Sequence, residues 1–100
     1  MVYLVAYIKL HPGKVEQFTE VLQHLAPILE RIGCWKLLGS YFNSIGRHNT
    51  VIDLWELPDA NAVQPALDAL VKTPEFRKWG PVVAECVEDE TFQIMTKLPV

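Results

Sequence analysis

Residues 39–59, GSYFNSIGRHNTVIDLWELPD, predict two β-strands joined by a short turn. The flanks are rich in aromatic and β-branched residues, which favour strands, whereas NSIGRHN between them holds the glycine and asparagine that favour turns. We therefore expect strands over 35–42 and 50–57. The second strand carries one acid, Asp53, in an otherwise apolar row. Because an unpaired buried carboxylate is costly, this acid needs a partner, water or a chemical task.

The segment before this hairpin predicts a strand followed by a long helix. Residues 2–10, VYLVAYIKL, are apolar at nearly every position, which is typical of a strand covered on both faces. After His11-Pro12-Gly13 the apolar residues recur at steps of three and four, which predicts a helix with one apolar stripe. We expect Gly33 to close this helix as a C-cap residue and Pro27 to kink it. The stripe consists of Val15, Phe18, Leu22, Leu25, Leu29 and Ile32.

The segment after the hairpin predicts further helices and a last strand. A second helical stripe tolerates Pro65 only near its start, so this helix should begin at about residue 62 or beyond. Thr73-Pro74-Glu75 has the N-cap residue, the first-position proline and the early acid of a new helix, which Gly80-Pro81 should interrupt. Residues 90–97, ETFQIMTK, alternate as a strand does. The second stripe consists of Val63, Leu67, Leu70 and Val71.

This order of elements (strand, helix, strand, strand, helices, strand) predicts an α+β fold of the ferredoxin-like βαββαβ type. Its four strands would form one antiparallel sheet with the helices on one face. A chain of 100 residues, half of them hydrophobic, has the usual size of a single domain, which we expect to span residues 1–100.

The two faces of this sheet should differ in what covers them. Helices cover only one face, and a monomer rarely exposes a wide apolar and aromatic surface like the one that remains. We therefore expect a homodimer in which two sheets pack together and leave a cavity between them. The residues placed under the helices are Leu4, Ala6, Ile8, Ile52, Leu54, Phe92 and Ile94. The residues placed on the opposite face are Tyr3, Val5, Tyr7, Val51, Asp53, Trp55, Gln93 and Met95.

The composition argues against a nucleic-acid-binding, a membrane-spanning and a secreted protein. A net charge of −3 with scattered basic residues argues against a nucleic-acid surface. No apolar run is long enough to cross a bilayer, and the first residues lack the basic leader and cleavage site of a secretion signal. Cys34 and Cys86 have no metal-site spacing around them, so we interpret them as reduced thiols and expect a cytoplasmic protein.

The hairpin 39–59 and two further segments, HPGKVEQF and TPEFRKW, follow one another along the chain. Together they resemble the NIPSNAP family, in which the first of these two segments is similar to the opening loop and helix and the second to the start of the second helix. Ser44 and Asp53 stand where the family usually has an acid and a histidine. The resemblance implies a dimeric α+β barrel, a group that includes cofactor-free monooxygenases, muconolactone isomerases and haem-handling proteins, although the NIPSNAP branch itself has no settled enzymatic activity. The matching residues of the hairpin are Gly39, Ile45, Gly46, Asn49, Val51, Leu54 and Trp55.

Asp53 is the candidate catalytic residue. On the inner face of a dimeric barrel, desolvation would raise its pKa, which suits a general acid or base near neutral pH. Its alternative role is structural, as the acceptor of a tyrosine hydrogen bond or the ion-pair partner of Arg47, Lys9 or Lys36 across the dimer. The candidate ligand-binding residues are Tyr3, Tyr7, Tyr41, His48, Asn49 and Trp55. The same aromatic residues equally suit a core or an interface, and the turn residues an exposed hairpin end.

These observations predict a protein that binds a small hydrophobic or aromatic molecule in the sheet-side cavity, with no metal and no cofactor. Whether it is an enzyme stays open. One alternative is a cofactor-independent monooxygenase or isomerase with Asp53 as general base, and another is a non-catalytic structural or interaction module. Haem binding, a further alternative, would need one of His11, His24 and His48 to face the cavity.

Overall fold

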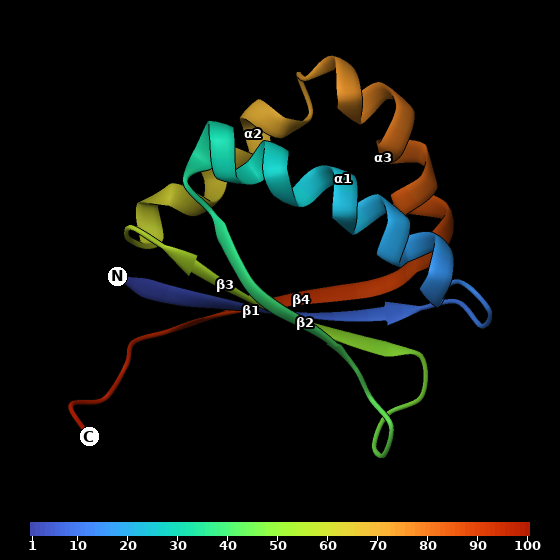
Figure 1. Ribbon diagram of the computed structural model, residues 1–100, viewed down its shortest axis with the longest axis horizontal. Coiled ribbons are helices and arrows are strands. Elements are labelled where there is room, and N and C mark those ends of the chain that lie inside the picture. The colour runs from blue at the N-terminus through green and yellow to red at the C-terminus, as the bar shows by residue number, and fades with distance from the viewer.

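The computed structural model describes residues 1–100 as a four-stranded antiparallel sheet with its helices packed on one face (Figure 1). The strands lie in the order β2-β3-β1-β4 across the sheet. This architecture confirms the α+β, ferredoxin-like fold expected from the order of elements. In chain order the elements are β1 (Val2–Leu10), α1 (Val15–Gly33), β2 (Lys36–Phe42), β3 (Thr50–Leu57), the short 3₁₀ helix η1 (Ala60–Ala62), α2 (Val63–Leu70), α3 (Pro74–Cys86) and β4 (Val87–Met95).

β1 occupies the interior of the sheet, which explains why it is apolar along its whole length. It pairs with β3 on one side and β4 on the other. Its even-numbered residues Leu4, Ala6, Ile8 and Leu10 are buried beneath the helices. Its odd-numbered residues point to the uncovered side of the sheet, which we call the open face.

The pairing of β3 with β1 corrects the face expected for β3. Directly opposed residues of an antiparallel ladder point to the same side, and Ala6 opposes Asp53 while Leu4 opposes Trp55. Asp53 and Trp55 therefore lie on the helix side, and the sequence prediction for this strand was wrong. Both sets of alternating β3 residues contain large apolar side chains, so alternation did not distinguish them. The residues exchanged are Val51, Asp53 and Trp55, which lie under the helices, and Ile52 and Leu54, which lie on the open face.

The end of α1 differs from the expectation that Gly33 is its C-cap. The left-handed position is occupied by Cys34, with φ of 58°, while Gly33 is the last helical residue. Gly33 serves packing instead, because a Cβ added there would lie 2.4 Å from the Cβ of Ala66 in α2. The glycine thus allows α1 and α2 to approach closely. The helix itself runs without interruption through Pro27.

The start of α3 confirms the predicted capping, but its course does not follow the prediction. The Thr73 hydroxyl accepts a hydrogen bond from the Phe76 backbone N–H, and Pro74 is the first helical residue. The helix then continues through Gly80 and Pro81 to Cys86, so the expected interruption was wrong. A proline ring clashes with the Cβ of the residue before it in a helix, and Gly80 has no Cβ.

α2 starts where the sequence predicts, whereas β4 differs from the prediction at both ends. α2 begins at Val63, which places Pro65 in its first turn as expected. β4 starts at Val87 and ends at Met95, earlier at both ends than the predicted strand. No helix of the structure is both long enough and apolar enough to cross a membrane.

Two tryptophans anchor the helices to the sheet at one end of the core. The rings of Trp35 and Trp55 meet edge to face with their centroids 5.5 Å apart. The Trp35 indole N–H donates to the carbonyl of Ala62, at a distance of 2.9 Å, so this buried donor is satisfied. These contacts hold Trp55, and with it the helix-facing row of β3, against the core.

Candidate functional site

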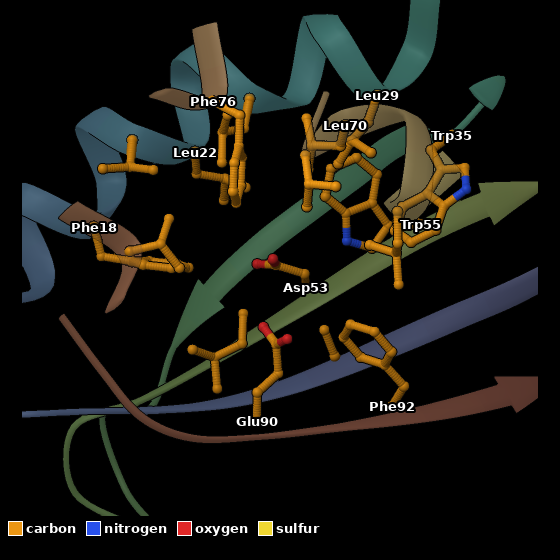
Figure 2. A pocket seen from close by; sticks show the side chains of 17 residues that line it. Phe18, Leu22, Leu29, Trp35, Asp53, Trp55, Leu70, Phe76, Glu90 and Phe92 are labelled. Carbon is orange, nitrogen blue, oxygen red and sulfur yellow. The ribbon is translucent and has the colours of Figure 1, made fainter. Parts of the chain in front are cut away.

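A cavity of about 240 Å³ lies between the helices and the sheet (Figure 2). Its wall is apolar, since 15 of its 17 lining residues are hydrophobic. The two exceptions are Asp53 and Glu90, whose carboxyl groups both point into the space between the sheet and the helices in Figure 2. An apolar cavity with a few converging polar groups is the usual form of a small-molecule site. The labelled aromatic and aliphatic residues of its wall are Phe18, Leu22, Leu29, Trp35, Trp55, Leu70, Phe76 and Phe92.

Asp53 is a nearly fully buried acid in this wall, with 2% of its surface exposed. Ser40 opposes it on β2, and the Ser40 hydroxyl donates to Asp53 Oδ1 at 2.5 Å. Burial raises the pKa of Asp53 above its ordinary value of 3.8, while the Ser40 hydroxyl and, more weakly, the Trp55 side chain stabilise the charged form and oppose the rise. Asp53 is therefore a stronger base than a solvated aspartate.

Asp53 forms no ion pair within the chain. The three salt bridges of the structure are Lys9–Glu88, Lys14–Glu85 and Arg31–Glu75, and none includes Asp53. No lysine, arginine or histidine lines the cavity. The buried carboxyl is held by a neutral hydroxyl, and no cation compensates it.

Glu90 is the second acid of the site, and sequence reasoning missed it. It opposes Ile8 on β1, whose side chain is buried beneath the helices, so Glu90 points to the same side. Desolvation raises the pKa of Glu90, and the nearby charges of Asp53 and Asp89 raise it further. The available signal was its place in the alternating strand, two residues before Phe92 on the helix-facing side. Glu90 was overlooked because the predicted strand began at that residue.

The cavity reaches solvent beside β4. Three of its lining residues are exposed, namely Glu90, Phe92 with 42% of its surface accessible and Val71 with 56%. Val71 follows α2, and the other two lie on β4, which forms an edge of the sheet. The opening therefore lies between the end of α2 and the edge strand, with Glu90 at its rim and Asp53 deeper inside.

The structure separates the residues predicted to form one site. Asp53 and Trp55 line the cavity, but Tyr3, Tyr7 and Tyr41 lie on the open face, on the other side of the sheet. The expected placement of Asp53 and Trp55 on the sheet's uncovered face, beside the tyrosines, was therefore wrong. The register of β3 places Asp53 and its cavity under the helices.

The turn residues lie at an edge of the molecule, away from the cavity. His48 and Asn49 belong to the β2–β3 connection, where Asn49 adopts the left-handed conformation with φ of 54°. This agrees with the turn role of asparagine. Neither residue lines the helix-side cavity; they lie in a shallow polar depression with Lys9 and Arg47.

The remaining candidate ligands for a metal or haem are dispersed. No group of three or more histidine, cysteine or acidic side chains is arranged to hold a metal ion. His11 and His48 are exposed, and His24 stacks on the Trp79 ring with a centroid distance of 4.2 Å. None of the three histidines lines the cavity, so it offers no imidazole to a haem iron.

Comparison with known proteins shows the family and supports the fold. The sequence profile described as NIPSNAP matches residues 3–100. The chain belongs to the NIPSNAP family. This membership agrees with the resemblance of the hairpin and of the two helix-starting segments. Among curated proteins, none matches the chain.

Solved structures similar to this NIPSNAP protein share its fold over nearly the whole chain. An uncharacterised NIPSNAP domain protein from Burkholderia xenovorans superposes with a TM-score of 0.82 at 18% identity, covering 99% of this chain and 96% of that one. A NIPSNAP family protein of unknown function from Agrobacterium tumefaciens gives 0.81 at 20% identity, covering 95% and 86%. A Bordetella bronchiseptica protein provisionally named an antibiotic biosynthesis monooxygenase gives 0.72 at 17% identity, covering 97% and 96%. At these identities the similarity shows the fold alone, and function is argued from the cavity.

Proposed function

We propose that this NIPSNAP protein binds a small, mostly apolar or aromatic molecule in the cavity between its helices and its sheet. The observation that carries the proposal is the cavity itself, about 240 Å³ in volume and lined almost entirely by hydrophobic side chains. Folded interiors are normally close-packed, so an open apolar space of this size favours a ligand. The carboxyl groups of Asp53 and Glu90 supply the few polar contacts that orient a bound molecule.

Binding can be tested with toluene as a neutral aromatic probe. We expect saturable chemical-shift changes in the amides around the cavity and none in the β2–β3 turn. Val71→Trp, at the opening, should weaken this binding at least tenfold by filling the entrance. Leu38→Trp is the matched control, because Leu38 is similarly exposed but does not line the cavity. An unchanged spectrum with toluene would contradict the proposal and favour a structural or interaction module.

A second candidate function is cofactor-independent catalysis, as a monooxygenase or isomerase with Asp53 as general base. It is supported by the raised pKa of a buried carboxyl that faces an apolar cavity. The fold similarity to the protein provisionally named an antibiotic biosynthesis monooxygenase points in the same direction. If the protein is an enzyme, Asp53→Asn should abolish turnover of its substrate and leave toluene binding intact. Undiminished turnover in that variant would eliminate Asp53 as the base.

The assembly we propose is a homodimer joined through the open face. Tyr7, Tyr41 and Met95 lie on this face with 41%, 62% and 41% of their surfaces exposed. Ile52 and Leu54 lie between the two tyrosine-bearing strands and are only partly buried. A contiguous patch of this kind is rarely left exposed. A second copy is the favoured cover because an apolar sheet face packs well on another sheet face.

We also propose that the protein works in the cytoplasm. Its thiols support this location, because Cys34 is exposed, Cys86 is buried, and the two are not joined by a disulfide. Free exposed cysteines are usual in reducing compartments. Cell fractionation should recover the protein with cytoplasmic markers, and recovery in a secreted fraction would contradict the proposal.

A further inference from the structure

The charge of the cavity indicates which chemical class of ligand it accepts. Asp53 and Glu90 are its two ionisable lining residues, and both are acids. The lining has no lysine, arginine or histidine from any of the helices or strands around it. A site for a carboxylate or phosphate ligand normally provides a cation or converging backbone N–H groups. This cavity instead provides hydrogen-bond acceptors.

The strand pairing makes both acids face the same ligand. Asp53 opposes Ala6 and Glu90 opposes Ile8, so the two acids stand on the same side of the sheet, one on each flank of β1. Asp53 on β3, Ala6 on β1 and Phe92 on β4 are directly opposed across the sheet. Because the Ala6 side chain is small, it leaves space between β3 and β4 on the helix side. Figure 2 shows the two carboxyl groups directed into this space below Phe76 and Leu22 of the helix wall.

The two carboxyl groups also lack a compensating charge in the protein. Ser40 donates one hydrogen bond to Asp53, and no salt bridge reaches either acid. Every buried side-chain nitrogen or oxygen atom has a hydrogen-bond partner. The carboxyl oxygens of the two acids that remain free to accept a hydrogen bond are therefore those that solvent or a ligand in the cavity can reach. A ligand that brings a donor or a positive charge would therefore find acceptors already in place. An anionic ligand would bring a negative charge next to two acids in apolar surroundings, where no cation offsets it, which is unfavourable.

We propose that the cavity selects compact aromatic or alicyclic molecules that carry an amine, held by Asp53 and Glu90, over anions of the same shape. This inference rests on the proposed binding function and adds the substrate class to it. The apolar part of the ligand packs against the aromatic wall, and its N–H groups donate to the two carboxyl groups. A neutral hydroxyl donor binds by the same contacts with one hydrogen bond fewer and no charge attraction.

The test compares four probes of nearly the same shape: benzylamine, benzyl alcohol, toluene and benzoate. Titrations followed by amide chemical shifts at pH 7.5 give their affinities. We expect benzylamine to bind about 10- to 100-fold more tightly than benzyl alcohol or toluene, the size of a charge-assisted hydrogen bond, and benzoate to bind most weakly. Benzoate binding as tightly as benzylamine would overturn the inference.

Two variants test whether Asp53 and Glu90 cause the preference for benzylamine. Glu90→Gln, at the exposed rim, should reduce the ratio of benzylamine affinity to toluene affinity at least threefold, and Asp53→Asn with Glu90→Gln should bring this ratio close to one. Glu20→Gln removes the same charge from the exposed face of α1 and should leave all four affinities unaltered.

The outcomes separate the two proposals. Toluene binding with no preference for the amine overturns the ligand class and leaves the binding function standing. Absence of binding by all four probes overturns the binding function and, with it, the ligand class. A preference that persists in Glu90→Gln and in the double variant shows that charges outside the cavity cause it, which also overturns the inference.

Discussion

Asp53 is an acid buried in an otherwise apolar row of β3. A carboxyl in an apolar strand costs free energy to bury, and it is kept here with 2% of its surface exposed. The Ser40 hydroxyl offsets part of that cost by donating a hydrogen bond to the carboxyl. Buried acids with raised pKa values gather at functional sites more often than elsewhere, which makes Asp53 the first residue to substitute.

The raised pKa of Asp53 predicts the direction in which stability changes with pH. Between the ordinary value of 3.8 and the higher folded value, the folded protein binds a proton that the unfolded chain does not. The free energy of unfolding should therefore fall as pH rises through this window, and it should stay low above it, where burial of the charged form disfavours folding. Asp53→Asn should flatten this part of the curve and stabilise the protein at pH 8.

Urea unfolding at several pH values measures this effect. Glu90, whose folded pKa is also raised, adds a slope of the same sign, so Asp53→Asn should remove only part of the dependence. Asp68→Asn, at an exposed acid of α2, is the control and should keep the wild-type curve. A stability that increases with pH over the same window would contradict the assignment.

Replacing Cys34 by glycine should stabilise the protein, because the backbone of Cys34 is left-handed. Its left-handed φ of 58° is strained for a residue with a Cβ, and glycine adopts it without strain. Cys34→Gly should raise the free energy of unfolding by about 0.5–1 kcal/mol, since relief of this strain exceeds the added entropy of the unfolded chain. Cys34→Ala keeps a Cβ and should leave stability near that of the wild type. Equal stabilisation by both variants in thermal unfolding would show that the thiol, and not the backbone, is responsible.

At the scale of elements, the contact of α1 with α2 depends on two small residues. A Cβ at position 33 would lie 2.4 Å from the Cβ of Ala66, well inside van der Waals contact, and neither atom belongs to a flexible chain end. The helices would have to move apart. Because α1 and α2 both line the cavity, their separation would also change its shape.

Gly33→Ala should therefore destabilise the protein by about 1–3 kcal/mol, the usual cost of overpacking. Adding Ala66→Gly should recover part of this loss, although glycine inside α2 itself costs about 1 kcal/mol. The four proteins of this double-mutant cycle, measured by urea unfolding, give the coupling between the two sites. Strictly additive effects would mean that the two residues do not limit the helix–helix distance.

At the scale of the whole molecule, the proposed homodimer predicts a change of mass on a single substitution. Tyr7→Glu places a charge on the exposed part of the open face and should convert a dimer into the 11.4 kDa chain in sedimentation equilibrium at micromolar concentration. Ile45→Glu makes the same replacement at a side chain that is 96% exposed in the turn, and should leave the dimer intact. A wild-type protein that sediments as a monomer would refute the proposal.

Much of the architecture follows from local patterns. The limits of β1 and β3, the capping of α3 by Thr73 and the late start of α2 all match the sequence prediction. Each depends on residues within one turn or one strand. The continuous helix through Gly80-Pro81 was missed, because the absence of a Cβ at one residue permits the proline that follows.

The candidate site was predictable only in part. Asp53 and Trp55 were recognised from an acid and an aromatic residue in an apolar strand, and both line the cavity. Tyr3 and Tyr7 were grouped with them because the residues of β3 were assigned to the wrong faces of the sheet; the register with β1 places Asp53 and Trp55 on the helix side and the two tyrosines on the open face. Glu90 was missed because the predicted strand began at that residue, whereas β4 starts at Val87 and includes Glu90 in its helix-facing row with Phe92.

The amino-acid order alone determined the kinds of elements, their sequence along the chain and the family, since hydrophobic periods and turn residues act over a few positions. Only the tertiary structure decided which side of β3 meets the helices. Both sides of that strand are apolar, so their burial energies are similar, and the choice is made by the register with β1 and by the packing of Trp55 against Trp35. As a result, Asp53 lies in the wall of the cavity beneath the helices and not on the open face of the sheet.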